Sequence, residues 1–392
     1  MNTIKKALLL FAAAASATAI FAADTPKTNL SKLYVNDFLI GVALPHQVTS
    51  QPRSDRAKLA ASQFNSITPE DCLKWDVIQP QEGKFFFGLA DDLVDFAQKN
   101  KMKIHGHALI WPTETPDWVF QKANGGHASR EEVLDRMKTY IEEVMLHFKG
   151  KIQIWEVVSD AFNDDGTLRD SLWRRTVGDD YIVRAFEFAH AADPSAKLVY
   201  NDCDSYNPAK HLSIVLLLRE LKSRGLIHAV GIQGHWSLDY PDTNKIGEYI
   251  REYASMGLKV LITEMDIDVL PTPPGYHPLP DSTMPFKIPN SPTYIKDYQY
   301  EYQQRYDPYS KSGLPDRISR LLAVRYSSLF KLFLTMSNTI YSVTFWGLDD
   351  GSSWLNNYPD PGRTNYPLLF DRQLKAKPCY DAIVEVKQSN KK

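Results

Sequence analysis

Short apolar runs alternate with amphipathic stretches along most of this chain. The stretch 130–148, for example, carries apolar residues at helical spacing at Val133, Met137, Ile141 and Val144. The apolar runs predict eight strands, at 38–43, 66–69, 102–111, a run ending at residue 160, 197–201, 229–235, 258–265 and 342–346. The amphipathic stretches predict eight helices, at 54–64, 90–99, 130–148, 181–192, 209–224, 245–256, 318–337 and 380–387.

This alternation of strand and helix predicts a single (β/α)8 TIM barrel over residues 24–392. An open, doubly wound sheet is the alternative architecture, but no Gly-rich phosphate loop follows the first strand. The segment Pro271–Pro315, dense in Pro and Tyr, interrupts the alternation after the seventh strand. Because long loops inside compact domains are usually functional or disordered, we expect this insertion to shape the rim of a cleft.

The composition weakens the case for several classes of partner. A formal net charge of −2 over 392 residues gives no electrostatic basis for binding nucleic acid or an anionic membrane. The three cysteines at 72, 203 and 379 imply neither a disulfide framework nor a zinc motif, and no feature demands a cofactor. The 20 Tyr and 8 Trp instead suit sugar rings, whose apolar faces pack on flat side chains. We expect a monomer.

The N-terminus has the features of a secretory signal peptide. Lys5 and Lys6 precede an Ala-rich apolar run that extends to about Ala23. We therefore predict a signal peptide over residues 1–23 and a secreted or periplasmic protein. No later segment is long and apolar enough to predict a membrane span.

Polar and aromatic side chains follow the predicted strands at their carboxyl ends, where a barrel of this type carries its functional residues. They are Glu70, Lys74, Trp75, His107, Trp111, Asp160, Asn201, Asp202, Gln233, His235, Glu264, Asp266 and Trp346. Hydrogen-bonding groups between aromatic platforms suit a neutral, polyhydroxylated ligand, and two strand-end carboxylates suit retaining glycoside hydrolysis. A metal bound by His107, His235 and Glu264 lacks any supporting local motif, so we predict no metal.

Several sequence runs resemble glycoside hydrolase family 10, the endo-β-1,4-xylanases. The matching runs occur in the order and spacing of that family and cover about residues 38 to 388. They are 64–70, 74–75, 106–111, 161–169, 231–235, 262–266, 345–347, 353–355 and 367–371. The resemblance implies a (β/α)8 barrel, a retaining mechanism with two carboxylates, and a cleft that binds the β-1,4-xylan backbone or xylo-oligosaccharides.

The resemblance also implies roles for individual residues. Glu264 corresponds to the nucleophile that attacks the anomeric carbon, and Asp160 lies at the position of the acid/base. His235 and Gln233 are expected to orient and hydrogen-bond the nucleophile. The remaining substrate-binding positions are expected to hold sugar hydroxyls or to form an aromatic wall; they are Glu70, Lys74, His107, Trp111, Trp346 and Trp354.

The sequence departs from the family pattern around the acid/base. The family has Asn-Glu after the fourth strand, where this chain has Ser159-Asp160. Pro112 replaces a His after the third strand, Asp71 replaces an Asn, and Cys203-Asp204 replaces Tyr-Asn. We expect the extra charges of Asp71 and Asp204 to raise the pKa of the nucleophile. We expect Glu156, deeper on the same strand face, to hydrogen-bond within the barrel.

Shortening the acid by one methylene withdraws the proton donor by on the order of 1 Å, and misplacement of that size can cost ~10²-fold in rate. Three hypotheses therefore stand. The protein is an endo-1,4-β-xylanase, slowed by Asp160; or it binds xylan or oligosaccharide without turnover; or its pocket has been rebuilt to hydrolyse a different β-glycoside.

Overall fold

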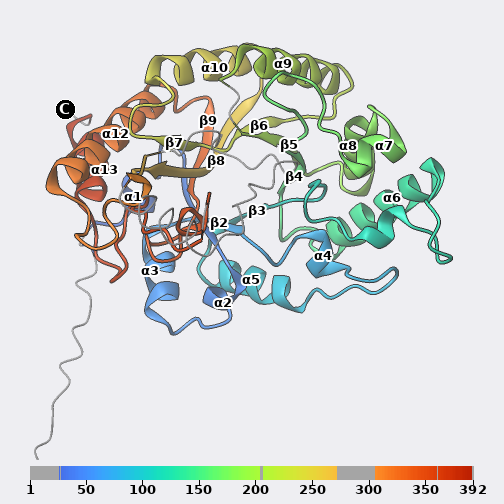
Figure 1. Ribbon diagram of the computed structural model, residues 1–392, viewed down its shortest axis with the longest axis horizontal. Helices are drawn as coiled ribbons and strands as arrows, with labels where there is room; N and C mark the ends of the chain where they lie inside the picture. The colour runs from blue at the N-terminus through green and yellow to red at the C-terminus, as the bar shows by residue number, and fades with distance from the viewer. Residues whose placement is uncertain (1–25, 27, 204–205, 272–304, 360, 391–392) are drawn as a thin grey trace, which may run out of the picture.

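The computed structural model describes residues 26, 28–203, 206–271, 305–359 and 361–390, and it confirms the predicted (β/α)8 barrel. Eight parallel strands pair in the order β1-β2-β3-β4-β5-β6-β8-β9, and β9 pairs back onto β1 to close the barrel. Figure 1 shows the helices on the outside of these strands. The strands are β1 Leu39–Leu44, β2 Ser66–Pro69, β3 Lys103–Gly106, β4 Ile154–Ser159, β5 Lys197–Asp202, β6 Ala229–Ile232, β7 His235–Ser237, β8 Lys259–Asp268 and β9 Ile340–Phe345.

The eight predicted helices are present, and several shorter helices accompany them. The long helices are α3 Asp55–Gln63, α5 Gly88–Lys99, α6 Arg130–His147, α8 Tyr181–Ala192, α9 Pro208–Ser223, α10 Thr243–Ser255, α12 Asp316–Thr335 and α13 Pro378–Ser389. The short ones are α1 Leu30–Leu33, α2 His46–Thr49, α4 Trp75–Ile78, α7 Leu172–Val177 and the 3₁₀ turns Asp117–Phe120 and Trp354–Asn356. Helix α6 starts at a capping box, in which Ser129 and Glu132 each bond the other's backbone N–H.

Two predicted strands were too long. The prediction of a strand over 102–111 is wrong beyond Gly106, because the neighbouring β2 ends at Pro69, whose nitrogen has no hydrogen to donate. The prediction over 229–235 is wrong beyond Ile232, because Gly234, with φ of +88°, turns the chain out of the ladder. The chain then forms β7, which pairs with the last residues of β8.

The barrel interior becomes polar towards the carboxyl ends of the strands. An apolar cluster is made by Ile154, Val199, Ala229 and Leu261. Side chains two residues apart share a strand face, so the next positions on this face are Glu156, Asn201, Gly231 and Thr263. Thr263 donates to Asn201 Oδ1 at 2.8 Å. A Cβ atom at Gly231 would lie only 2.3 Å from Asn201 Oδ1, so only glycine lets this layer close.

The insertion after the seventh barrel strand is described only at its ends. Its last residues dock on the segment that follows β9: Asp307 is buried and accepts from the Thr364 N–H at 3.2 Å. Tyr366 donates to the Tyr309 carbonyl at 3.2 Å. The rest of the insertion, residues 272–304, and the predicted signal peptide over 1–23 lie outside the described residues. Among the described helices, none is both long enough and apolar enough to cross a bilayer.

Candidate active site

The structure brings the predicted site residues together at the carboxyl end of the barrel. Five of the ten directly follow a strand: Glu70 after β2, His107 after β3, Asp160 after β4, Gln233 after β6 and Trp346 after β9. Others are carried by the next turns or by the long β8 and its partner; they are Lys74, Trp111, His235, Glu264 and Trp354.

Glu264 lies buried in β8 and is held by hydrogen bonds to both carboxylate oxygens. Asn201 Nδ2 donates to Oε1 at 2.8 Å, and His235 Nε2 lies 3.1 Å from Oε2. Burial acts to raise the pKa of Glu264, but the hydrogen bond and charge of His235 outweigh it and hold the pKa below the usual value. Glu264 is therefore ionised at neutral pH.

His235 is kept positively charged by a second carboxylate. Its Nδ1 lies 3.0 Å from Asp266 Oδ1, while Trp354 Nε1 donates to Asp266 Oδ2 at 2.7 Å. Burial alone would lower the pKa of His235, but Asp266 and Glu264 raise it to about 10. Both ring nitrogens therefore carry protons and donate, and a chain of contacts from Trp354 through Asp266 and His235 fixes Glu264.

Asp160 is half-buried at the end of β4, and both of its oxygens accept hydrogen bonds. Gln233 Nε2 donates to Oδ1 at 2.9 Å, and Trp111 Nε1 donates to Oδ2 at 3.0 Å. Burial, followed by the charge of Asp202, raises the pKa of Asp160 to about 6. Gln233 was expected at the nucleophile, but its side chain binds Asp160 and only its carbonyl accepts from the Glu264 N–H, at 2.7 Å.

The surroundings thus shift the pKa values of the two carboxyl groups in opposite directions. The pKa of Asp160 is raised by burial to about 6, and the pKa of Glu264 is lowered by its hydrogen bonds. Environments that separate the pKa values of two carboxyls assign one to carry a proton and the other to stay ionised. That is the division of labour that acid-assisted nucleophilic displacement requires.

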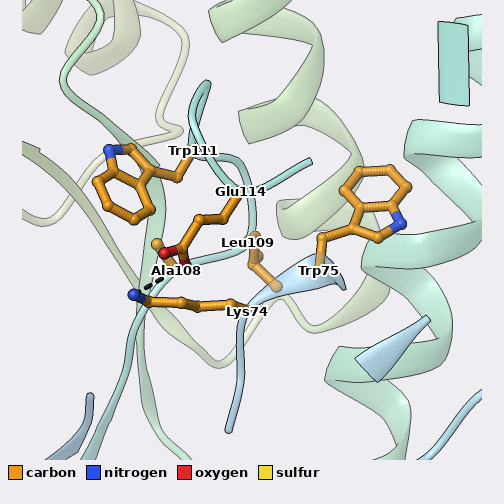
Figure 2. Close-up of a pocket in the computed structure, with 6 residues that line it drawn as sticks. All are labelled: Lys74, Trp75, Ala108, Leu109, Trp111 and Glu114. Atoms are coloured by element: carbon orange, nitrogen blue, oxygen red, sulfur yellow. Dashed lines mark ion pairs between the residues drawn. The ribbon is translucent and has the colours of Figure 1, made fainter. Parts of the chain in front are cut away.

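Lys74 forms an ion pair with Glu114 beside the site. Its ammonium lies 2.7 Å from Glu114 Oε2 and 4.8 Å from the centroid of the Trp111 ring, and Figure 2 shows the pair joined beside Trp111. Lys74, Glu114 and Trp111 line a small pocket, and Trp75 lines it from the other side. The Trp75 ring stacks on Tyr140 with 3.8 Å between centroids. Glu114 is not among the site residues predicted from sequence, because an acidic residue in a loop belongs to no periodic pattern.

The charge of Asp71 acts on the neighbouring carboxyl of Glu70. Asp71 Oδ2 lies 2.8 Å from His46 Nδ1. Burial, followed by Asp71, raises the pKa of Glu70 to about 7. The pKa of Glu264 is lowered and not raised, because His235 dominates at that carboxylate, so the expectation fails for Asp71. Asp204 lies outside the described residues.

Two half-buried indoles form a wall beside the imidazoles. The Trp346 ring lies 5.2 Å from the His107 ring, and the Trp354 ring lies 4.9 Å from the His235 ring, both edge to face. Trp354 also stacks on Tyr358 at 4.9 Å. Flat, partly exposed faces of this kind suit the apolar faces of sugar rings.

One group of potential metal ligands includes Glu264 itself. His107, Glu156 and Glu264 bring donor atoms within 4.8 Å of one another. His107 Nδ1 already bonds Glu156 Oε1 at 3.1 Å, which confirms the expectation that Glu156 hydrogen-bonds within the barrel. The contact accounts for how this cluster is held, and we assign it no metal.

A second such group includes Asp160. Asp160, Asp202 and Cys203 also bring donor atoms within 4.8 Å of one another. Here a protein cation is already in place, since Lys210 Nζ lies 2.9 Å from Asp202 Oδ1 and 3.3 Å from Cys203 Sγ. We assign no metal or cofactor to this group either.

Comparison with known proteins supplies the family. The family model described as glycosyl hydrolase family 10 matches residues 29–386. Endo-1,4-beta-xylanase A of Xylanibacter ruminicola is 39% identical over 352 residues, which are 89% of this chain and 90% of the relative. A solved family 10 endoxylanase from a sugarcane soil metagenome has a TM-score of 0.80 at 38% identity, with 92% of this chain and 100% of that chain covered. A mutant of the intracellular xylanase of Thermoanaerobacterium saccharolyticum, solved in complex with xylotriose, has a TM-score of 0.74 at 34% identity, with 91% and 98% covered.

Proposed function

The protein chain belongs to glycosyl hydrolase family 10. On that premise we propose that it cleaves internal glycosidic bonds of β-1,4-xylan with retention of anomeric configuration. It is a glycoside hydrolase of the xylanase type. The observation that carries the proposal is the pairing of an ionised Glu264 with an Asp160 whose pKa burial raises to about 6. The half-buried Trp346 and Trp354 support a sugar as the ligand.

In the proposed first step, Glu264 attacks the anomeric carbon and forms a covalent ester with the sugar. The glycosidic bond breaks, and its oxygen leaves with the proton of Asp160. In the second step, Asp160 takes a proton from water while the water oxygen attacks the same carbon and releases Glu264. His235 keeps the nucleophile ionised in the free enzyme, and Gln233 with Trp111 holds the acid.

The experiment that tests the proposal is hydrolysis of xylan and xylohexaose. We expect reducing sugar to be released from both, with oligomeric products early in the reaction. Proton NMR of the first products should show the β-anomer before mutarotation. An α-anomer would contradict the retaining mechanism, and no release from xylan with turnover of another β-glycoside would contradict the substrate.

A bell-shaped pH profile of kcat/KM is expected from the two carboxyls. Asp160 must be protonated, and because its pKa is about 6, activity should fall as pH rises through about 6. Glu264 must be ionised, and because its pKa is lowered, activity should persist at acid pH below the usual carboxyl range. Asp160→Asn should remove the basic limb near pH 6. A basic limb that is unchanged in Asp160→Asn would assign it to another group, such as Glu70 with its pKa of about 7.

A further inference from the structure

Asp160 has a backbone conformation that its surroundings must maintain. Its φ is +54°, in the left-handed region that non-glycine residues seldom adopt. Such a conformation persists only where neighbouring contacts over-determine it. Two of these contacts come from β5: the Asp160 N–H donates to the Asn201 carbonyl at 3.1 Å, and the Ala161 N–H donates to the Tyr200 hydroxyl at 3.3 Å.

The Tyr200 hydroxyl is oriented for this task. Tyr200 is fully buried, and its O–H donates to Asp202 Oδ2, which leaves the oxygen lone pairs for the Ala161 N–H. Burial, followed by the charge of Asp202, raises the pKa of Tyr200 well above its usual value, so the hydroxyl keeps its proton.

Asp202 is in turn held in place by a buried cation. Lys210 on α9 is fully buried, and its Nζ lies 2.9 Å from Asp202 Oδ1. The Cys203 N–H donates to the same oxygen at 2.8 Å. A salt bridge with one partner removed leaves an uncompensated buried charge, so Lys210 and Asp202 hold each other strongly. The result is a continuous relay from Lys210 through Asp202 and Tyr200 to the backbone beside Asp160.

We propose that Tyr200, held by Asp202 and Lys210, is a positioning residue that keeps Asp160 where it can protonate the leaving sugar. The inference rests on the proposed role of Asp160 as the proton donor. Tyr200 acts through the Ala161 N–H and not through contact with substrate. It therefore affects the step that needs the proton and leaves the attack by Glu264 intact.

The experiment compares two substrates in Tyr200→Phe, which removes only the hydroxyl. Xylohexaose has a sugar leaving group that needs a proton, whereas dinitrophenyl β-xylobioside releases a stable phenolate that does not. The readout is kcat/KM, which reports formation of the glycosyl ester and not its hydrolysis, the step in which Asp160 acts as base on either substrate. We expect kcat/KM on xylohexaose to fall about tenfold, and kcat/KM on the aryl substrate to change by less than about twofold. Equal losses on both substrates would mean a merely structural role, and no loss on either would also overturn the proposal.

Two controls separate this inference from the proposed function. Tyr34→Phe removes another fully buried hydroxyl, which donates to the Ile383 carbonyl at 2.6 Å away from the site, and should change neither rate. Asp160→Asn should lose ~10²-fold or more in kcat/KM on xylohexaose and far less in kcat/KM on the aryl substrate. If Asp160→Asn shows no such selectivity, the role of Asp160 fails; if it does and Tyr200→Phe does not, only the role of Tyr200 fails.

Asp202→Asn gives a second readout through pH. Among the described residues, the charged or ionisable groups that face Asp160 are Asp202 at the end of β5, Cys203 after it, Arg169 in the loop after β4, Lys210 on α9 and Glu264 on β8. Removing the negative charge of Asp202 lowers the proton affinity of Asp160, so the basic limb of kcat/KM should move to lower pH. An unmoved limb, or one moved to higher pH, would contradict the placement of the Asp202 charge beside a proton-donating Asp160.

Discussion

Glu264→Gln is expected to lower kcat on xylan by on the order of 10⁴-fold or more, because removing a covalent nucleophile leaves only binding and the other site groups. The amide keeps the size of the side chain but cannot form the glycosyl ester. Reducing-sugar release at saturating xylan measures the loss. Glu114→Gln makes the same chemical change at the carboxylate that pairs with Lys74 at 2.7 Å, and it should lose less than about tenfold.

Folding and binding must survive in Glu264→Gln for this result to be informative. Asn201 and His235 both donate to Glu264, at 2.8 Å and 3.1 Å, and an amide offers only one acceptor oxygen. His235 must therefore give up its Nε2 proton or face another donor, and we expect a loss of stability of about 1–2 kcal/mol in denaturant unfolding. Calorimetry should still detect xylohexaose binding. Residual turnover within about tenfold of wild type would sink the assignment of Glu264.

The same measurements on the wild-type protein separate the enzyme from the binding-protein hypothesis. A wild type that binds xylohexaose but releases no reducing sugar is a binding protein on a hydrolase scaffold. A wild type that does neither, yet hydrolyses another β-glycoside, has a rebuilt pocket. The ionised Glu264 and the protonatable Asp160 favour turnover over binding alone, and they suit xylan and another β-glycoside equally.

The barrel was readable from sequence because the apolar runs and helical stripes repeat regularly, and each has to bury one face. The errors fell where backbone geometry and not hydrophobicity ends a strand. Residues 107–111 remain largely buried and apolar, and Leu109 and Ile110 still donate to β4. Their pattern therefore matches a strand, although the regular ladder ends at Gly106 and only an isolated bridge joins Ile110 to Val158. The turn at Gly234 depends on a positive φ that the apolar pattern does not encode.

The site was predictable where residues directly follow a strand and only in part elsewhere. Glu264 and Asp160 could be found because strand ends of a parallel barrel converge. Tyr200 falls within the predicted strand 197–201 and Lys210 within the predicted helix 209–224, and the apolar pattern gives neither residue a role. Lysines are almost never fully buried without a partner. Lys210 is fully buried, and its partner Asp202 is known only once α9 is placed against β5.

Ser159→Asn with Asp160→Glu is expected to raise kcat/KM on xylan by about 10²-fold, because it returns the proton donor to the reach that the family uses. The two oxygens of Asp160 accept hydrogen bonds from Gln233 at 2.9 Å and from Trp111 at 3.0 Å. A Glu side chain is longer by one methylene and extends its carboxyl group further. An amide at residue 159 also supplies a donor for the sugar 2-hydroxyl, a bond that strengthens in the transition state. Initial rates on xylohexaose measure the gain.

The gain should be specific to the step that needs a proton. Dinitrophenyl β-xylobioside, which needs none, should gain far less than xylohexaose in the double variant. The φ of +54° at Asp160 suits Asp better than Glu, so the double variant should lose up to about 1 kcal/mol in denaturant unfolding while it gains activity. Asp160→Glu alone and Ser159→Asn alone divide the gain between reach and the amide. If neither single variant nor the double variant is faster than wild type, the shorter acid does not limit this enzyme, and Pro112 after the third strand becomes the next position to restore.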